Sequence, residues 1–139
     1  MSQQTAILLL GSNLGDVKKN IDTAVQQIEN SGCVILNKSK YLINKPVEFD
    51  SINYFCNIAI SINTQHSPMQ LLSKLKKIEQ DMGRISDSAA SGHYTDRIID
   101  IDIVSINKLT FSCEKLKIPH HKHLYERKFS RELIEELGM

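Results

Sequence analysis

Cysteine is scarce in this sequence, and its few positions indicate neither a disulfide framework nor a metal site. Cys33, Cys56 and Cys113 are odd in number and far apart, and they form no CxxC or Cys/His ligand spacing. We therefore expect reduced thiols with a structural role. A chain of 139 residues needs no cross-links, because one domain of this length buries about two-thirds of the surface that its unfolded chain exposes. We expect residues 1–139 to form a single domain.

An excess of charge of one sign and long apolar runs are also lacking. Seventeen basic and sixteen acidic residues leave a net charge of +1, which argues against the broad field that nucleic-acid or anionic-membrane binding requires. The first residues carry no basic n-region, and the apolar run at 6–10 is too short for a signal peptide or a membrane span. We expect a cytoplasmic protein with neither nucleic acid nor membrane as a partner, in which any recognition of anions is local.

Hydrophobic spacing predicts six main elements and a short final helix. Ile58, Ile60 and Ile62 alternate with polar or small residues, which is typical of a half-buried strand. Ser67 and Gln70 form a capping box that starts a helix. We place strands at 5–10, 34–41, 57–62 and 97–106, and helices at 16–32, 67–83 and 130–137. The order βαββαβ predicts an α+β, ferredoxin-like fold, with an antiparallel sheet, both main helices on one face, and the opposite face open for the active site.

Two acidic residues stand in the middle of the apolar strand predicted at 97–106. Strand alternation puts Asp100 and Asp102 on one face, together with Ile98, Val104 and Ile106, and about 6.6 Å apart. Like charges in an apolar setting are unfavourable unless a cation or hydrogen bonds compensate them. Carboxylate oxygens at this separation suit Mg²⁺. The alternative is a solvent-facing edge strand on which both aspartates serve only solubility.

Basic side chains supply candidates for contacts with phosphate. Guanidinium groups match phosphate geometry and can stabilise charge on a transferring phosphoryl group, and the candidates are Arg84, Arg97 and Arg127. Each of them taken alone is interpreted as a surface arginine. His120 and His121 follow Pro119 directly, and either imidazole could hydrogen-bond a phosphate or be an exposed loop histidine.

An amide and an aromatic ring on the polar side of the strand at 57–62 are candidates for a heterocycle site. Asn57 could hydrogen-bond the edge of such a ring, and Phe55 could stack on its face. Their structural alternative is a strand-end amide beside a turn aromatic. Glu79 can pair with Lys76 on the surface of its helix, but it lies one turn before the helix end, where a role in the site is also open.

Five segments in this order resemble the 6-hydroxymethyl-7,8-dihydropterin pyrophosphokinase family of folate biosynthesis. They are LGSNLGD at 10–16, FCNIAI at 55–60, LLSKLKKIEQDMGR at 71–84, RIIDIDI at 97–103 and IPHHKHLYERKF at 118–129. The resemblance covers nearly the whole chain, and the family's ferredoxin-like α+β fold agrees with the strand pattern. No single segment is specific, but their order and spacing together are.

The resemblance implies a role for each matching position. Asp100 and Asp102 would bind two Mg²⁺ that bridge the phosphates of ATP, while Arg84 and Arg97 neutralise the transferring groups. The residues implied around the pterin are Pro46, Val47, Phe55, Asn57 and Phe129. Those implied around the nucleotide are Glu79, Arg84, Tyr94, Arg97, Ile99, His120 and Arg127.

The chain departs from the family pattern in the segments around the nucleotide. Ser86 stands where some members carry a second arginine, and a loop tryptophan is absent, with Tyr94 as its expected stand-in. One extra residue between Pro119 and Arg127 leaves either His120 or His121 as the family histidine, and we favour His120 because it follows the proline.

The implied reaction is attack of the pterin's own hydroxyl on the β-phosphorus of ATP, giving AMP and the pterin pyrophosphate by positioning and charge stabilisation. We expect a monomer, with the loop at 86–96 closing over the nucleotide. Two alternatives stay open. One is a binding-only protein that keeps the pterin and nucleotide pockets, and the other is a ferredoxin-like module that binds Mg²⁺ regardless of pterin.

Overall fold

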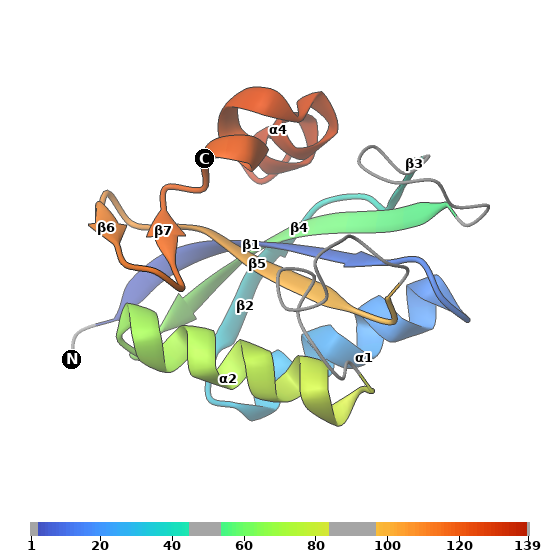
Figure 1. The fold of residues 1–139 in the computed structure, drawn as a ribbon, viewed down its shortest axis with the longest axis horizontal. Helices are drawn as coiled ribbons and strands as arrows, with labels where there is room; N and C mark the ends of the chain where they lie inside the picture. The colour runs from blue at the N-terminus through green and yellow to red at the C-terminus, as the bar shows by residue number, and fades with distance from the viewer. Residues whose placement is uncertain (1–2, 45–53, 84–96, 139) are drawn as a thin grey trace.

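The computed structural model describes residues 3–44, 54–83 and 97–138 as a sheet with helices on both faces (Figure 1). In chain order the elements are β1 (Gln4–Ser12), α1 (Val17–Asn30), β2 (Val34–Lys38), β3 (Leu42–Asn44), β4 (Phe55–Thr64), α2 (Pro68–Asp81), β5 (Asp100–Ile106), β6 (Phe111–Ser112), β7 (Lys117–Ile118), the π-helix η1 (Lys122–Glu126) and α4 (Lys128–Glu135). The predicted elements are all present, with shifted ends. Strand β3, the β6–β7 hairpin and the π-helix were not predicted.

The main sheet is antiparallel, and β1 lies at its centre. Its strand order is β2-β4-β1-β5, and β3 pairs with the other end of β4. From Ala6 to Ser12 every residue of β1 is buried, because strands border it on both sides and side chains cover both faces. This confirms an α+β fold with an antiparallel sheet.

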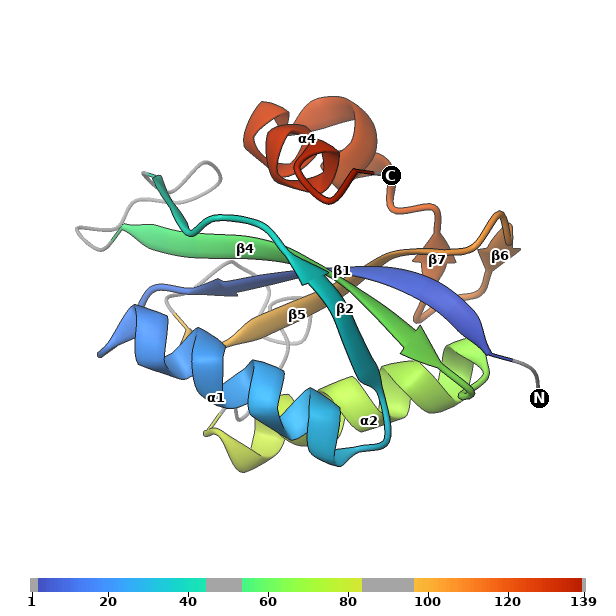
Figure 2. The same cartoon turned by 180° about the vertical axis from the view of Figure 1, so that it is seen from behind.

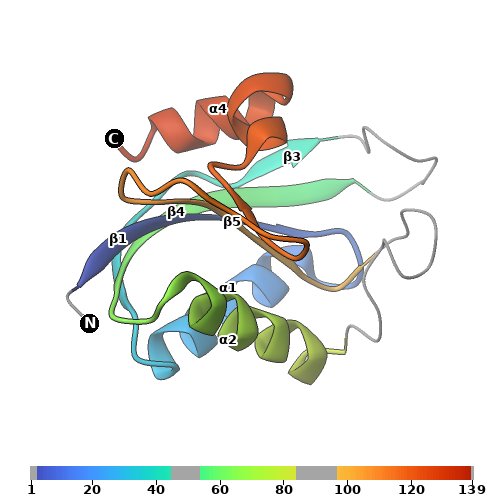
Figure 3. The ribbon, with the colours of Figure 1, turned by 60° about the vertical axis from the view of Figure 1, so that its left-hand side comes forward.

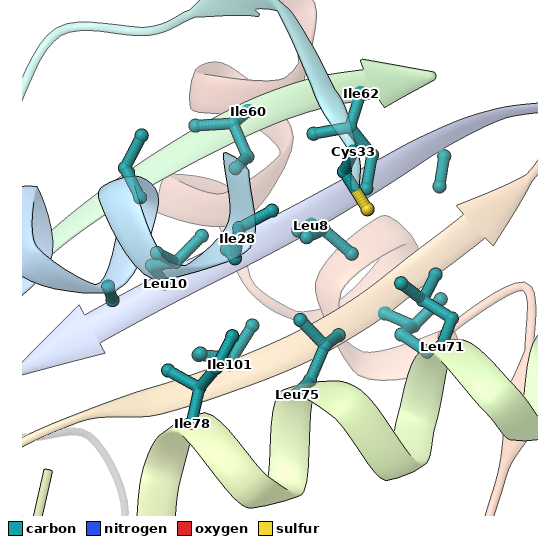
Figure 4. Packing of buried hydrophobic residues seen from close by; sticks show 14 of the residues in the cluster. Leu8, Leu10, Ile28, Cys33, Ile60, Ile62, Leu71, Leu75, Ile78 and Ile101 are labelled. Carbon is teal, nitrogen blue, oxygen red and sulfur yellow. The ribbon is translucent and has the colours of Figure 1, made fainter. Parts of the chain in front are cut away.

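Both long helices pack on the same face of the sheet (Figures 1 and 2). Their apolar residues meet the inward side chains of β1, β4 and β5 in one core cluster, in which Figure 4 labels Leu8, Leu10, Ile28, Leu75 and Ile101 among others. The predicted capping box at the start of α2 is confirmed, since the Ser67 hydroxyl accepts from the Gln70 N–H while the Gln70 side chain accepts from the Ser67 N–H.

The opposite face is partly covered by α4 (Figure 3), so the prediction of an open face is wrong over this region. A second cluster of buried residues lies between the helix and the sheet: Ile7, Leu9, Ala59, Val104, Leu133, Ile134 and Leu137. We call it the α4 cluster. Burial of these side chains stabilises the docked helix, and the site is confined to the part of the face beyond it.

A β-bulge in β5 changes which side chains share a face. Leu8 pairs with Ile103, but Ile7 pairs with Ser105, so Val104 is an extra residue between them. The bulge leaves Val104 in the α4 cluster and turns Ile106 to the helix side. The predicted grouping of Ile106 with the aspartates is therefore wrong. It is also wrong for Ile98, which precedes the strand and packs against the helix-side core.

The three cysteines are free, as expected. Among the helices that the structure describes, none is long and apolar enough to cross a bilayer.

Candidate active site

Three positions form a row across the sheet on the face that also carries α4. Gly11 in β1 pairs with Asn57 of β4 on one side and with Asp100 of β5 on the other. In the next row Leu9 lies between Ala59 and Asp102. Neighbouring strands lie about 4.8 Å apart, so the backbones of the outer pair in a row are about 10 Å apart. Gly11 has no side chain, so no side chain rises from the middle strand between Asn57 and Asp100.

Gly11 is required by the close approach of Asn57. A Cβ at position 11 would lie 2.6 Å from Asn57 Oδ1 and 3.7 Å from Phe55 Cδ1. Asn57 is 6% exposed, and its Nδ2 group is buried with no hydrogen-bond partner among the residues that the structure describes. A buried donor without a partner is unfavourable by about 1–3 kcal/mol. A ligand acceptor within reach of Nδ2 would remove this penalty.

Asp102 is held by a chain of buried hydrogen-bonding groups. His123 Nε2 lies 2.7 Å from Asp102 Oδ2, and His123 Nδ1 lies 2.8 Å from the Ser130 hydroxyl at the start of α4. His123 is 2% exposed and Ser130 is fully buried. Burial by itself would raise the pKa of Asp102, but the hydrogen bond and charge of His123 outweigh it and hold the pKa at about 2. The Asp102 carboxylate is therefore ionised at neutral pH.

Asp100 faces an arginine that the turn after β1 holds in place. Arg97 Nη1 lies 3.4 Å from Asp100 Oδ1. The Arg97 N–H donates to Asn13 Oδ1 at 2.7 Å, and the Asn13 N–H donates to the Arg97 carbonyl at 3.0 Å. The same turn leads into α1, where the Asp16 side chain caps the helix. The segment at 10–16 thus fixes a cation beside the site.

Glu79 is buried and not on the helix surface. It is 2% exposed, and its Oε2 accepts from the Ile101 N–H of edge strand β5 at 2.7 Å. The predicted pairing with Lys76 is present, at 3.6 Å from Nζ to Oε1, but the surface interpretation is wrong. This carboxylate ties α2 to the strand that carries the aspartates.

The histidine segment turns His120 inward and His121 outward. The His120 N–H donates to the carbonyl of the bulge residue Val104 at 2.8 Å, and its ring centroid lies 4.2 Å from that of His123. Burial, followed by the charge of His123, lowers the pKa of His120 to about 4. The side chain of His121 is 73% exposed and lies 3.5 Å from Glu126. Of the two open candidates, His120 is the one near Asp102.

The remaining predicted residues fall into three groups. Phe55 is half-buried beside Asn57, and Phe129 packs against the α4 cluster together with Leu42, which pairs with Asn57. Ile99 is fully buried in the helix-side core, so only its backbone can face a nucleotide. Arg127 lies between η1 and α4. Pro46, Val47, Arg84 and Tyr94, like the loop at 86–96, lie outside the described residues.

Sequence reasoning missed His123, Ser130 and Asn13. His123 is separated from Asp102 by 21 positions in sequence, and no spacing rule links a strand residue to one in a later π-helix. Asn13 offered a weak signal, because an asparagine in a turn commonly bonds nearby backbone groups.

Comparison with known proteins confirms the resemblance. The family model for 7,8-dihydro-6-hydroxymethylpterin-pyrophosphokinase (HPPK) matches residues 7–138. The mitochondrial folate synthesis bifunctional protein of Arabidopsis thaliana is 34% identical over 138 residues, which cover 99% of this chain and 24% of that protein. The 2-amino-4-hydroxy-6-hydroxymethyldihydropteridine pyrophosphokinase of Bacillus subtilis is 31% identical over 125 residues, covering 89% of this chain and 72% of that protein.

A solved structure supports the fold alone. The crystal structure of an HPPK-DHPS protein in complex with substrates has a TM-score of 0.54 and 20% identity, over 79% of this chain and 29% of that one. The chain spans about a quarter of the length of the Arabidopsis relative. Since the family match extends over nearly the full sequence, the chain belongs to the 7,8-dihydro-6-hydroxymethylpterin-pyrophosphokinase family.

Proposed function

We propose that this protein transfers the β,γ-diphosphoryl group of ATP to the hydroxymethyl arm of 6-hydroxymethyl-7,8-dihydropterin, a step of folate biosynthesis. The products are AMP and the pterin pyrophosphate. One observation beyond family membership carries the proposal: the unsatisfied amide of Asn57 and the carboxylate of Asp100 lie in the same row on one face of the sheet, with Gly11 between them. A heterocycle at one end and phosphates at the other match this arrangement.

Asn57 and its neighbours form the pterin end of the site. A pterin edge carries carbonyl and ring-nitrogen acceptors, and the buried Nδ2 of Asn57 is a donor that needs one. Phe55 and Phe129 are proposed to stack on the ring, since Phe55 lies beside Asn57 near Gly11 and Phe129 packs against the α4 cluster on the same side of the sheet. Pro46 and Val47 are proposed to complete the pocket.

The two aspartates are proposed to hold two Mg²⁺ ions. The donor set fits, because Mg²⁺ prefers carboxylate oxygens and takes its other ligands from water and phosphate. Asp102 is ionised, and Asp100 extends from the same face two residues earlier. When bound, the ions neutralise the charge of the ATP phosphates.

The chain's own cations would act on the transferring group. Arg97, fixed by Asn13, can neutralise charge that develops on the phosphoryl oxygens. Arg84 is proposed to do the same, and Glu79, Tyr94, Ile99, His120 and Arg127 are proposed to contact the nucleotide. The pterin hydroxyl attacks the β-phosphorus directly, so the protein contributes position and charge and forms no covalent intermediate.

The sheet is proposed to be ferredoxin-like in detail. β1 and β2 are both antiparallel to β4, which lies between them, and α1 connects them. β4 and β5 likewise flank β1 and are connected by α2. Two interleaved split βαβ units are the defining feature of that fold. The single domain, the monomeric state and the cytoplasmic location stay predictions of the sequence.

The identity of the nucleotide product tests the proposed reaction. With ATP, Mg²⁺ and the reduced pterin, AMP should form, and its formation should require the pterin. Asp100→Ala and Asp102→Ala should lose most turnover, whereas Asp81→Ala, an exposed aspartate paired with Lys77 at the end of α2, should keep it. Tight pterin binding without AMP would support the binding-only alternative and refute the proposal, as would ADP as the product.

A further inference from the structure

The Asp102 carboxylate is part of a cluster with two imidazoles. One ligand atom each from Asp102, His120 and His123 lies within 4.8 Å of the other two. The three residues come from β5, from the segment after β7 and from η1, so the fold assembles them from separate elements. A magnesium site does not require nitrogen ligands, and the buried ring of His123 has no role in the reaction proposed above.

The spacing of these atoms is close to that of ligands on one small ion. Bonds of about 2.0–2.1 Å at tetrahedral angles put two ligand atoms about 3.3 Å apart. The distance from His123 Nε2 to Asp102 Oδ2, 2.7 Å, is slightly shorter than this value. The other ligand-atom distances in the cluster are at most 4.8 Å. Side-chain shifts of about 1 Å would bring all three to coordination distance.

Ser130 supplies the outer contact that a metal-binding imidazole usually has. Its hydroxyl lies 2.8 Å from His123 Nδ1, and a hydroxyl can either donate or accept. Without an ion, His123 Nε2 donates to the Asp102 carboxylate. When an ion replaces that Nε2 proton, Ser130 accepts from Nδ1–H and the Nε2 lone pair faces the ion. Such contacts fix the tautomer and the orientation of a ligating histidine. Ser130 is fully buried, so this orientation is held by the packing of α4.

We propose that Asp102, His120 and His123 form a three-ligand site for a divalent ion that prefers imidazole nitrogen, represented by Zn²⁺, and that this ion competes with Mg²⁺ for Asp102. The competition rests on the proposed function. Two imidazoles and one carboxylate, with a fourth position left to water, are a common ligand set for zinc. Asp100 is not part of the cluster, so the two aspartates differ in role.

Binding of Zn²⁺ is measured on the full chain without nucleotide or pterin. Calorimetry should find one Zn²⁺ per chain, and Co²⁺ should give the absorption bands of a low-coordinate site. His120→Ala and His123→Gln should each weaken Zn²⁺ binding at least about tenfold. His121→Ala is the matched control, because it removes a neighbouring imidazole that faces solvent, and it should bind Zn²⁺ like the wild type.

The aspartates give a second comparison. Asp102→Asn should weaken Zn²⁺ binding, whereas Asp100→Asn should leave it unchanged. Because His123 is buried, His123→Gln can fail to fold, and circular dichroism melts of each variant show whether it folds. His120 is partly exposed, so His120→Ala still tests the site if His123→Gln is unfolded. Wild-type Zn²⁺ affinity in both His120→Ala and Asp102→Asn would overturn the proposal, and so would an equal loss in His121→Ala.

The competition with Mg²⁺ is a separate measurement. Zn²⁺ should inhibit pterin-dependent AMP formation, excess Mg²⁺ should relieve the inhibition, and the residual activity of His123→Gln should be less sensitive to Zn²⁺. Inhibition that Mg²⁺ does not relieve would overturn the competition. If the chain formed no AMP at all, the proposed function would fail while the Zn²⁺ measurement still decided the metal site. If Zn²⁺ did not bind, the proposed reaction would be unaffected.

Discussion

Gly11→Ala tests whether pterin binding needs a residue without a side chain beside Asn57. The new methyl group would lie 2.6 Å from Asn57 Oδ1, far inside contact distance. The atom it meets is the end of a side chain and not backbone, so the conflict can be relieved by turning the Asn57 amide. We expect this rotation to move the Nδ2 donor away from the position that faces the pterin.

The expected loss is larger in binding than in stability. Turning the amide to a less favourable rotamer costs about 0.5–1.5 kcal/mol of folding free energy. Loss of its hydrogen bond to a buried ligand group costs about 1–3 kcal/mol of binding free energy, which is about a 5- to 150-fold rise in the Kd for the pterin. Gly32→Ala is the stability control. Gly32 has φ +100°, where alanine is strained by about 1–2 kcal/mol, and in the described structure no atom comes within 4 Å of its added Cβ.

The assay is calorimetric titration with the pterin in the presence of Mg²⁺ and an unreactive ATP analogue, together with thermal melts. A double-mutant cycle with Asn57→Ala isolates the mechanism, because removing the amide removes the clash. Introduced into the wild-type protein, Gly11→Ala should therefore weaken pterin binding. Introduced into the Asn57→Ala variant, it should have little further effect on pterin binding. Unchanged pterin affinity in Gly11→Ala, or additive losses in the double variant, would refute this reasoning.

Three further predictions concern groups around this site and the core. Glu79→Ala should lower the free energy of unfolding by about 1–3 kcal/mol in urea denaturation, because it leaves the Ile101 N–H buried without its acceptor, and Glu79→Gln, which keeps an oxygen, should lose less. The pKa of His120 is about 4, below its ordinary 6.5, so the stability that the neutral imidazole contributes is present above pH 6.5 and is lost as the pH falls towards 4. We expect a loss of about 1 kcal/mol in the free energy of unfolding after solvent screening. His120→Gln should remove this part of the pH dependence in chelator-treated protein. The hydrogen bond to Asp22 raises the pKa of Tyr41 to about 12, and Asp22→Asn should return it towards 10 in an ultraviolet absorbance titration.

Local signals in the sequence predicted the elements well. The capping box at Ser67 and the alternation at Ile58, Ile60 and Ile62 depend on neighbours within a few residues. The structure confirms the capping box and puts the three isoleucines in the helix-side core. The prediction of a half-buried strand was wrong, because β4 is buried on both faces and Ala59 on its other face lies in the α4 cluster. The two aspartates of β5 were placed on one face by the same kind of local alternation. The grouping of Ile106 with them was wrong because a bulge at Val104 depends on the pairing with β1 and not on the strand's own sequence.

Contacts between distant segments could not be predicted. The apolar residues of α4 indicated a helix, but not that it would cover the α4 cluster on the face expected to be open. The burial of Glu79 and the contact of His123 with Asp102 likewise arise only when α2 and η1 dock on β5. Asn13 bonds Arg97 across 84 positions of sequence, a separation at which residue patterns carry no signal.

A crystal structure with Mg²⁺, an unreactive ATP analogue and the pterin would show whether the two aspartates of β5 hold metal ions against the triphosphate. We expect carboxylate oxygens of Asp100 and Asp102 to bind the ions that bridge the phosphates, and Asn57 Nδ2 to donate to the pterin. Ions bound elsewhere, with both carboxylates directed away from the triphosphate, would contradict this expectation.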